Sequence, residues 1–484
     1  MDTDAPTKST PLWGWDELIA ASGGRPDGTP TQAVTGFAIN SREISPGDVF
    51  VALRDKRDGH DFVNSAFAGG AAAALVDEQY QRQDGDGALV RVSDTFVALE
   101  DIGRAARARL APDARVIAVT GSAGKTTTKD MLRASFGSLG PTHAADRSFN
   151  NHLGVPLTLA RMPADTRYGV FELGMSHAGE IAHLTRLVRP HVAIVLNVLP
   201  AHLGNFAGEG EIADAKAEIF QGLEPDGVAI LNGDSPHFDR LRKIATGHTA
   251  QIMTFGSAES GADGALIDCG QRARDGKPGQ KILAEFPSCG MMTYQIALAG
   301  RHTAENSLAA LLAVDAVGGD VQRAAMALAE VAPSSGRGER ISLPVEHGTV
   351  LLIDESYNAN PGSMAAAIRT AAQTRGNDKR RLILALGDML ELGDRGLELH
   401  RGLADTIDAA GVDLVFASGA QMAALFEALP EHRRGQWAAR STDLLEPILA
   451  TLQYGDVIMV KGSNGSAMGA LVAGLKQHYA GPER

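Results

Sequence analysis

Residues 116–127 read VIAVTGSAGKTT, and this stretch decides how the middle of the chain is expected to fold. An apolar run precedes Gly121 and a helical pattern over 126–139 follows Lys125, which together predict a strand, a tight loop and a helix. Glycines let backbone N–H groups turn toward an anion, and the helix adds its positive end. The stretch therefore predicts a phosphate-binding loop.

The loop departs from the common form G-x-x-x-x-G-K-[ST], because Val119 stands where the first glycine of that form would be. A turn that binds no nucleotide is the alternative, but the flanking strand and helix favour a phosphate loop. Lys125 then neutralises the β- and γ-phosphate oxygens, and the Thr126 hydroxyl holds Mg²⁺. The residues expected to bind the nucleotide here are Gly121, Ser122, Ala123, Gly124, Lys125, Thr126 and Thr127.

Strand and helix patterns alternate around this loop, which predicts a mostly parallel sheet covered by helices. Its strands are expected at 116–119, 168–173, 192–197 and 228–232, and its helices at 126–139, 178–188, 211–223 and 304–317. The Gly-, Asp- and Gln-rich stretch 257–285 indicates hairpins or loops.

A second doubly wound α/β unit is expected from about residue 333, after a hinge at 333–336 (PSSG). Its strands are expected at 350–353, 382–386, 414–417 and 457–460, and its helices at 363–374, 397–410 and 421–429. We expect three domains, with bounds 1–110, 111–332 and 333–484.

The first block is also expected to mix strands and helices. Strands are predicted near 34–39, 48–53 and 73–76, with helices up to Gly23, over 64–70 and over 95–110. The pattern of the last helix directs Arg104, Arg107 and Arg109 to its outer faces. Residues 111–113 (APD) break that helix and mark the boundary.

Composition narrows the class of protein. The 484 residues, 44% of them hydrophobic, are enough for a large core and several domains. Lys and Arg total 45 against 58 Asp and Glu, and the resulting net charge of -13 repels nucleic acid. Cys269 and Cys289 have no metal-ligand spacing, which indicates reduced thiols in a cytoplasmic protein. The polar start and the lack of a long apolar run predict neither a secretory signal nor a membrane span.

Three side chains in the middle block are candidate metal ligands. Glu172 ends the strand at 168–173, and His202 follows the strand at 192–197. Carboxyl ends of parallel strands face the ligand crevice, and Mg²⁺ prefers oxygen ligands. Taken singly, a helix cap and a surface histidine are equally good interpretations. Lys216 taken singly indicates a solvated helix face, since only a carbamate would make it an oxygen donor.

Further polar residues could contact substrates. Asn150 and Asn151 offer donors and acceptors for a peptide or phosphate, although turns and caps use the same residues. Asn306 could contact an adenine edge. Arg337 could reach a γ-phosphate across an interdomain cleft, and an exposed loop arginine is the alternative.

Polar runs follow successive strands of the C-terminal block, which predicts a crevice at one edge of its sheet. The runs are DESYNANP at 354–361, LGDMLELG at 386–393 with His400 downstream, and KGSNG at 461–465. Asp354 could hold a ribose hydroxyl. The residues expected at a second substrate are Tyr357, Asn358, Asn360 and Asp388.

Taken together and in this order, these motifs resemble the Mur ligases, which are cytoplasmic three-domain enzymes of peptidoglycan synthesis. The resemblance covers nearly the whole chain. It rests on 120–126, Asn150-Asn151, Glu172, His202, Lys216, His302 with Asn306, Arg337 and Asp354. The runs NSR at 40–42, PGDVFVAL at 46–53 and DGHDF at 58–62 are similar to the uridine-nucleotide domain of that family. The family often has Asp where Asn40 stands, and Arg340 could take the place of Arg337 in an alignment.

The resemblance implies an α/β fold with a small uridine-nucleotide domain, a central P-loop ATPase-like domain and a C-terminal Rossmann-like domain. SYNANP at 356–361, LGDMLELG at 386–393 and KGS at 461–463 resemble the branch that joins D-alanyl-D-alanine to UDP-N-acetylmuramoyl-tripeptide. The implied partners are these two substrates, with no nucleic acid and no membrane span, for a cytoplasmic monomer. Ser41, Arg42, Asn150 and Asn151 are implied substrate contacts.

The implied cofactors are ATP and two Mg²⁺ ions. Thr126 and Glu172 would hold the first ion, and His202 with a carbamylated Lys216 the second. Lys125 and Arg337 would spread the charge of the transferring phosphoryl group. The tripeptide carboxylate would form an acyl phosphate, which the amine of the dipeptide then attacks after the C-terminal domain closes.

Two other functions stay open at this point. The branch that adds the third residue of the stem peptide typically has Asp-Asn-Pro-Arg in its last domain and Asp-Tyr-Ala-His at the ribose strand, and neither occurs here. A nucleotide-gated regulator or amidotransferase partner could keep the fold without the chemistry. The joint presence of Glu172, His202 and Lys216 argues against it.

Overall fold

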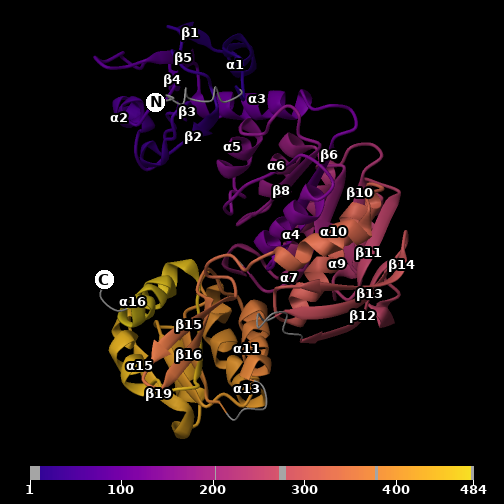
Figure 1. Cartoon of the computed structure of the whole chain (residues 1–484), viewed down its shortest axis with the longest axis vertical. Helices are drawn as coiled ribbons and strands as arrows, with labels where there is room; N and C mark the ends of the chain where they lie inside the picture. The colour runs from indigo at the N-terminus through magenta and orange to yellow at the C-terminus, as the bar shows by residue number, and fades with distance from the viewer. Residues whose placement is uncertain (1–10, 202, 272–278, 376–379, 481–484) are drawn as a thin grey trace, which may run out of the picture.

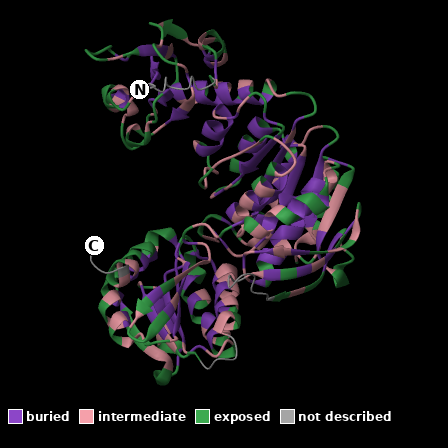
Figure 2. Cartoon of the chain, in the orientation of Figure 1, coloured by how far each residue is buried: buried purple, intermediate pink, exposed green. Residues whose placement is uncertain are grey.

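The computed structural model describes residues 11–201, 203–271, 279–375 and 380–480. Within these ranges three separate β-sheets follow one another along the chain, each with its own helices (Figure 1). The N-terminal sheet lies at the top of Figure 1, the central sheet at the right and the C-terminal sheet at the bottom. Buried residues fill the strands of all three sheets (Figure 2). The predicted three-domain α/β architecture is confirmed.

The N-terminal sheet has the strand order β1-β5-β4-β3-β2, with β1 antiparallel to β5 and the other strands parallel. Its strands are β1 (Arg25–Asp27), β2 (Gly36–Ala38), β3 (Asp48–Val51), β4 (Ala73–Asp77) and β5 (Ala88–Val92). Its helices are α1 (Trp15–Ser22), α2 (Val63–Ala68) and α3 (Thr95–Ala108). The Asp94 side chain accepts hydrogen bonds from the backbone N–H groups of Phe96 and Val97, which caps α3.

The central sheet has the order β14-β13-β12-β11-β10-β9-β6-β8-β7, parallel from β7 to β12. The predicted core strands are β6 (Arg115–Thr120), β8 (Tyr168–Glu172), β9 (Val192–Val195) and β10 (Val228–Asn232). The other strands are β7 (Thr142–Ala144), β11 (Gln251–Ser257), β12 (Gly264–Gln271), β13 (Gln280–Phe286) and β14 (Gly290–Ile296). Strands β12 and β13 pair antiparallel, as expected for a hairpin in 257–285.

Helices cover both faces of the central sheet (Figure 1). They are α4 (Lys125–Gly137), α5 (Gly154–Ala160), α6 (Glu180–Val188), α7 (Glu209–Ala217), α8 (Phe238–Thr246), α9 (Arg301–Ala316) and α10 (Val321–Ala327). None of the helices in the described ranges is long and apolar enough to cross a membrane.

The C-terminal sheet has the order β15-β16-β20-β17-β18-β19, with only β15 antiparallel to its neighbour. The strands are β15 (Glu339–Val345), β16 (Gly348–Glu355), β17 (Leu382–Gly387), β18 (Leu414–Ser418), β19 (Arg434–Ala438) and β20 (Val457–Lys461). The helices are α11 (Pro361–Arg375), α12 (Gly396–Arg401), α13 (Leu403–Ala409), α14 (Met422–Ala428), α15 (Leu445–Thr451) and α16 (Met468–Ala480). The predicted Rossmann-like unit is present.

Arg107 corrects one expectation about α3. The helical pattern directed it outward, but it is only 8% exposed. Its guanidinium donates to the carbonyl oxygens of Val188 and Arg189 (2.9 and 2.7 Å) and to Glu224 (3.2 Å). The pattern failed because the outer face of α3 is covered by the central domain, which a single helix cannot reveal.

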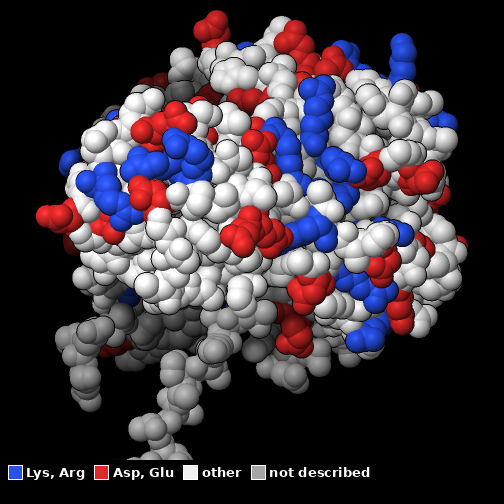
Figure 3. All heavy atoms as spheres, turned by 90° about the horizontal axis from the view of Figure 1, so that it is seen from above, with Lys and Arg blue, Asp and Glu red and all other residues white. Residues whose placement is uncertain are grey.

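The net charge of the chain is spread over the surface in small groups. On the face seen from above in Figure 3, basic and acidic side chains lie interspersed. Oppositely charged side chains also pair within the N-terminal domain, where Asp27 lies 3.0 Å from Arg82 and 2.9 Å from Arg91. Local pairing of this kind leaves that face without a broad region of one sign.

Candidate active site

The predicted phosphate loop joins the carboxyl end of β6 to the first turn of α4. Strand β6 lies between β8 and β9, so the chain reverses its winding direction there and leaves a crevice. Gly124 has a φ of 82°, and a Cβ at this position would lie 2.7 Å from Nδ2 of Asn306. Glycine is therefore required by the backbone and by its neighbour. Asn306, predicted to contact adenine, packs against the loop and also lines the cleft described below.

Asn197 supports the loop and was not predicted as a site residue. Its side chain accepts a hydrogen bond from the N–H of Ala123 (2.9 Å) and donates one to the carbonyl of the same residue (3.0 Å). Its carbonyl accepts from the N–H of Ser122 (3.0 Å). The available signal was its place just past a buried strand, as for Glu172.

Glu172 is the centre of a buried polar cluster. Its carboxylate accepts hydrogen bonds from the Thr126 hydroxyl (2.7 Å), the Ser148 hydroxyl (3.0 Å) and the Asn150 amide (2.6 Å). The side chain is only 4% exposed. The structure thus brings together Thr126 and Glu172, the pair expected at the first ion, and it adds Ser148 and also Asn150, which was expected at a substrate. One carboxylate with two hydroxyl oxygens is a donor set that suits Mg²⁺.

Two lysines lie near this cluster. Lys125 donates to the carbonyl of Gly121 (2.8 Å). Burial lowers the pKa of Lys125, and Arg337 adds to that shift while Glu172 opposes it. Lys216 on α7 is 2% exposed, so the solvated-face interpretation is wrong. Burial, and secondarily the charge of Lys125, hold the pKa of Lys216 well below its usual value.

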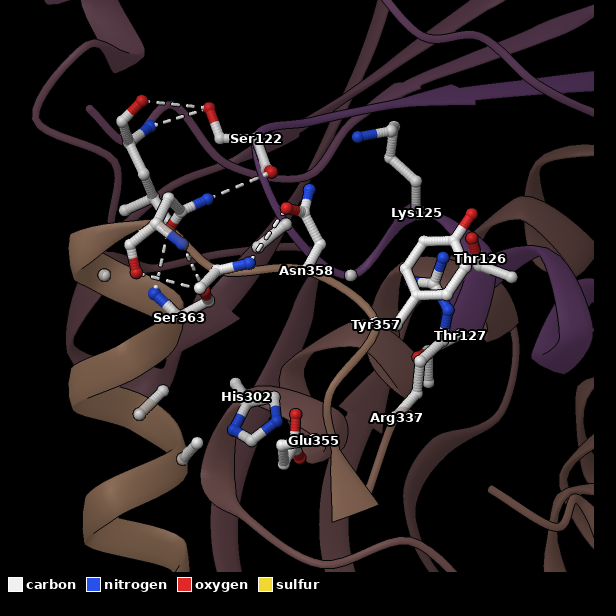
Figure 4. A pocket seen from close by; sticks show the side chains of 18 of the residues that line it. Ser122, Lys125, Thr126, Thr127, His302, Arg337, Glu355, Tyr357, Asn358 and Ser363 are labelled. Carbon is white, nitrogen blue, oxygen red and sulfur yellow. Dashed lines mark hydrogen bonds between the residues drawn. The ribbon is translucent and has the colours of Figure 1, made fainter. Parts of the chain in front are cut away.

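A cleft of about 790 Å³ opens between the central and C-terminal domains. Its central wall includes the phosphate loop, Glu172, His302 and Asn306, and its C-terminal wall includes residues of three strand ends. Figure 4 shows part of both walls, with Lys125 and His302 on the central side and Glu355 and Tyr357 on the C-terminal side. Hydrogen bonds across the junction join Asn360 Nδ2 to the Ser122 carbonyl (3.3 Å) and the Ser334 hydroxyl to Asp130 (2.9 Å). The phosphate loop and the C-terminal motifs therefore share one cavity.

Arg337 and Arg340 both line this cleft. The guanidinium of Arg337 lies over the ring of Tyr357, 3.8 Å from its centroid (Figure 4). Arg340 donates to the Thr374 hydroxyl (2.7 Å), and burial lowers its pKa. The guanidinium of Arg337 thus contacts a ring, while that of Arg340 is hydrogen-bonded to α11.

Asp354 and Glu355, at the end of β16, differ in whether they line the cleft. Asp354 is 2% exposed and accepts hydrogen bonds from the N–H and hydroxyl of Ser356 (3.0 and 2.6 Å). Asp354 is not among the residues that line the cleft, whereas Glu355 is. Glu355 pairs with Lys461 (3.2 Å), which also donates to the carbonyl of Asn358 (2.9 Å). Successive side chains along a strand point to opposite faces. The sequence could therefore predict that one of these two carboxylates faces the cleft, but not which one.

His302 faces Glu355 across the cleft (Figure 4). The protein around the ring lowers the pKa of His302 by desolvation, and the negative charge of Glu355 partly offsets this shift. His302 was noticed in the sequence only as part of a family motif. Its position makes it a contact for whatever occupies the space between the two domains.

The predicted second-substrate residues separate into two groups. Tyr357, Asn358 and Asn360 line the cleft. Asp388 does not line it, because its carboxylate turns away and accepts the backbone N–H groups of Gln421 and Met422 (3.3 and 2.7 Å). Asp388 therefore holds the start of α14, and Leu390 with Glu391 form the cleft wall in its place.

The remaining predicted residues lie elsewhere or outside the described residues. Asn151 lines the cleft, and its side chain also accepts the N–H of Gly154 (2.9 Å) at the start of α5. Ser41 and Arg42 lie in a short 3₁₀ turn of the N-terminal domain and do not line the cleft. His202 falls outside the described residues.

Three family models match consecutive parts of the chain. The Mur ligase family catalytic domain matches residues 33–122, the Mur ligase middle domain matches 119–314, and the Mur ligase glutamate ligase domain matches 336–464. Together these models span all three sheets.

Curated relatives match nearly the full length. The chain is 35% identical over 442 residues to the UDP-N-acetylmuramoyl-tripeptide--D-alanyl-D-alanine ligase of Escherichia coli, covering 91% of this chain and 93% of the relative. It is 34% identical over 447 residues to the ligase of the same name from Bacillus subtilis, with coverage of 91% and 93%.

Solved structures agree with the sequence relatives. MurF from Acinetobacter baumannii superposes with a TM-score of 0.81 at 31% identity, covering 96% of this chain and 99% of that one. MurF ligase from Thermotoga maritima in complex with ADP gives a TM-score of 0.74 at 25% identity, with coverage of 92% and 98%.

Proposed function

The chain belongs to the Mur ligase family, and we propose that it joins D-alanyl-D-alanine to UDP-N-acetylmuramoyl-tripeptide at the expense of ATP. The products are UDP-N-acetylmuramoyl-pentapeptide, ADP and phosphate, and the reaction serves peptidoglycan synthesis and hence cell shape and division. The observation that carries the proposal is one cleft that holds both the phosphate loop and the Tyr357–Asn360 segment. The names of the full-length relatives support this choice of substrates.

The phosphate end of the cleft is assigned to ATP. Backbone N–H groups of the loop and the first turn of α4 bind the phosphate oxygens, and Lys125 neutralises their charge. Thr126 and Glu172 would hold Mg²⁺, which screens the triphosphate from the attacking carboxylate. Arg337, released from Tyr357, reaches the transferring phosphoryl group. Glu355, whose side chain faces the cleft, replaces Asp354 as the residue assigned to the ribose.

The peptide carboxylate attacks the γ-phosphorus, ADP leaves, and an acyl phosphate forms. The amine of D-alanyl-D-alanine then attacks the acyl carbon, phosphate leaves, and the amine loses a proton as the amide forms. Both steps need the two walls of the cleft together, so closure of the C-terminal domain on the central domain precedes chemistry. Ser41 and Arg42 are assigned to the uridine nucleotide, and Asn150 and Asn151 to the peptide end.

Lys216 is assigned a carbamate. Burial and the charge of Lys125 lower the pKa of Lys216, which favours the neutral amine, the form whose lone pair can attack CO₂. The Nζ–C bond forms, one proton leaves, and the anionic product relieves the repulsion between Lys216 and Lys125. With His202 this group would hold a second Mg²⁺. Lys216→Ala should abolish turnover, and short carboxylic acids should partly restore it; normal turnover in Lys216→Ala would refute the carbamate.

The domain divisions near residues 110 and 332, a cytoplasmic location and a monomeric state complete the proposal. The divisions fall between the three sheets, in the segments that separate β5 from β6 and β14 from β15. Sedimentation of the purified chain with and without ATP tests the monomer.

One assay tests the reaction. Phosphate release from ATP should require both UDP-N-acetylmuramoyl-tripeptide and D-alanyl-D-alanine. Release with UDP-N-acetylmuramoyl-dipeptide and a diamino acid would assign the chain to the branch that adds the third residue. ATP binding without turnover under either condition would favour a regulator that lacks ligase chemistry.

A further inference from the structure

His400 is a buried histidine behind the cleft whose hydrogen bonds define its protonation state. It lies on α12 and is 0% exposed. Its Nδ1 is 2.6 Å from the carbonyl oxygen of Gly396, and its Nε2 accepts the backbone N–H of Met389 (2.9 Å). A carbonyl can only accept and an N–H can only donate, so the neutral ring with its proton on Nδ1 satisfies both. Burial lowers the pKa of His400, which favours the same neutral form.

The group that His400 holds belongs to the loop 388–393. Three consecutive backbone groups of this loop are hydrogen-bonded to His400 or to Ser463, which lines the cleft: the carbonyl of Asp388 accepts from the N–H of Ser463 (3.1 Å), and Met389 donates to His400. The third, the N–H of Leu390, donates to the Ser463 hydroxyl (2.9 Å). The side of the loop that faces α12 and the end of β20 is thus fastened through its backbone.

The other side of the loop faces the cleft and the central domain. Leu390 and Glu391 line the cavity. Glu391 has a φ of 63°, a strained conformation for a residue other than glycine. Its carbonyl accepts the N–H of Gly204 from the central domain (3.0 Å). A strained backbone persists only where its surroundings hold it, and His400 is one of the groups that do so.

We propose that His400 is a positioning residue for the incoming dipeptide, acting through the loop 388–393 rather than by touching substrate. This inference rests on the proposed function, because it assigns the C-terminal wall of the cleft to D-alanyl-D-alanine. Its hydrogen bond to Met389 holds the backbone that presents Leu390 and Glu391 to the cavity. None of the residues assigned to ATP, namely the phosphate loop, Arg337 and Glu355, belongs to the loop 388–393, so ATP binding is expected to be independent of His400.

The test compares Michaelis constants for the two substrates. His400→Leu should raise KM for D-alanyl-D-alanine about tenfold, the effect expected from one lost buried hydrogen bond, while KM for ATP stays within about twofold. His400→Gln keeps an acceptor for the Met389 N–H and should recover most of the loss. A matched control is His191→Leu, because Nδ1 of His191 also accepts a backbone N–H, that of Val116 (2.9 Å), at the end of β6 remote from the cleft.

Several outcomes would overturn the proposal. They are an unchanged KM for the dipeptide in His400→Leu, an equal rise in both constants, and the same rise in His191→Leu. If His400→Leu fails to fold, two-bond ¹H–¹⁵N spectra of the wild-type enzyme report which ring nitrogen of His400 carries the proton. The signals that are missing from the spectrum of His400→Gln identify those of His400. A wild-type ring protonated on Nε2 at neutral pH contradicts the inference. Absence of dipeptide-dependent phosphate release in the wild type would instead refute the proposed function.

Discussion

The central domain meets its two neighbours in very different ways. On the N-terminal side one hydrophobic core runs without interruption from Trp13 and Leu99 into Val155 and Leu159. On the C-terminal side the cores are separate, and Leu203 is the partly buried apolar residue of the central domain that packs against the C-terminal core. The first junction resembles a domain interior, and the second is a cleft crossed by a few polar contacts.

Arginines fasten the N-terminal junction to backbone carbonyls. Arg161 donates to the carbonyl of Phe37 (2.8 Å), Arg109 to that of Met162 (2.8 Å) and Arg107 to that of Val188 (2.9 Å). The indole of Trp13 donates to the carbonyl of Ala160 (2.9 Å). Such bonds are buried or partly buried and directional, so the N-terminal and central domains are expected to move as one body.

We therefore expect the N-terminal junction to contribute to stability and the cleft at the C-terminal junction to contribute to catalysis. The largest effect is then expected at Lys125, which faces the cleft. Lys125→Met should lower kcat about a thousandfold, because it removes a preorganised charge from the transferring phosphoryl group. Unfolding should not shift to lower temperature, because folding depresses the pKa of Lys125 and its charged form costs free energy in the folded state. Turnover and thermal melting of one preparation measure both, and a large loss of stability would contradict the assignment.

The N-terminal junction should respond in the opposite way. Arg107→Met leaves two carbonyls and Glu224 without a buried donor, and it should lower the free energy of unfolding by about 3 kcal/mol. KM for ATP should stay near its wild-type value. Arg104→Met on the same helix is the matched control: that side chain is 48% exposed, and its loss should cost under about 1 kcal/mol. Urea titrations measure both free energies of unfolding. Equal decreases in the two variants would show that the buried bonds of Arg107 stabilise the protein no more than an exposed ion pair does.

A smaller effect is expected at a contact that crosses the cleft. Asn360 accepts the N–H of Ser363 at the start of α11 (2.8 Å) and donates to the Ser122 carbonyl (3.3 Å). Asn360→Ser keeps a helix cap but cannot reach Ser122, so KM for ATP should rise about fivefold with little change in melting. Asn360→Ala should add a loss of about 1 kcal/mol in stability. An unchanged KM for ATP in both variants would show that the contact between Asn360 and Ser122 does not contribute to ATP binding.

The smallest effect concerns pH at the base of β6. Burial lowers the pKa of His191 to about 4. The unfolded chain takes up a proton near its ordinary pKa of about 6.5, so stability should fall as the pH drops from about 6.5 toward 4. After allowance for solvent screening the loss is about 1 kcal/mol. His191→Gln should flatten this part of a plot of melting temperature against pH, whereas an identical slope would assign the acid sensitivity to other groups.

Much of the fold could be predicted from patterns near in sequence. The strands β6, β8, β9 and β10 are short apolar runs. Helix α4 follows a glycine-containing loop, and the strand before that loop and the helix after it favour a phosphate-binding loop. Strand β7 escaped notice because it has only three residues, and β5, although as long as β8, carries a charged residue in its sequence ALVRV. Their presence depends on partners that a local pattern does not reveal.

The candidate site divides in the same way. Gly124, which acts through its backbone, and Lys125, which follows it in the loop, were predicted from the motif alone. Asp354 and Asp388 were singled out by residue type at strand ends, but each is turned to a backbone partner, and Glu355 and Leu390 line the cleft beside them. A strand end specifies where a polar residue lies, whereas the packing behind it decides which neighbour points inward.

By itself the sequence determined the order of the three α/β units, the phosphate loop and the set of polar residues at the strand ends, because these depend on periodicity and on backbone freedom within a few residues. Only the tertiary structure decided that Lys216 and Arg107 are buried, since burial depends on which surfaces meet across long separations. It also decided that the phosphate loop and the C-terminal motifs line one cleft. Each of these features is formed by segments that are far apart in the sequence and come together only when the chain folds.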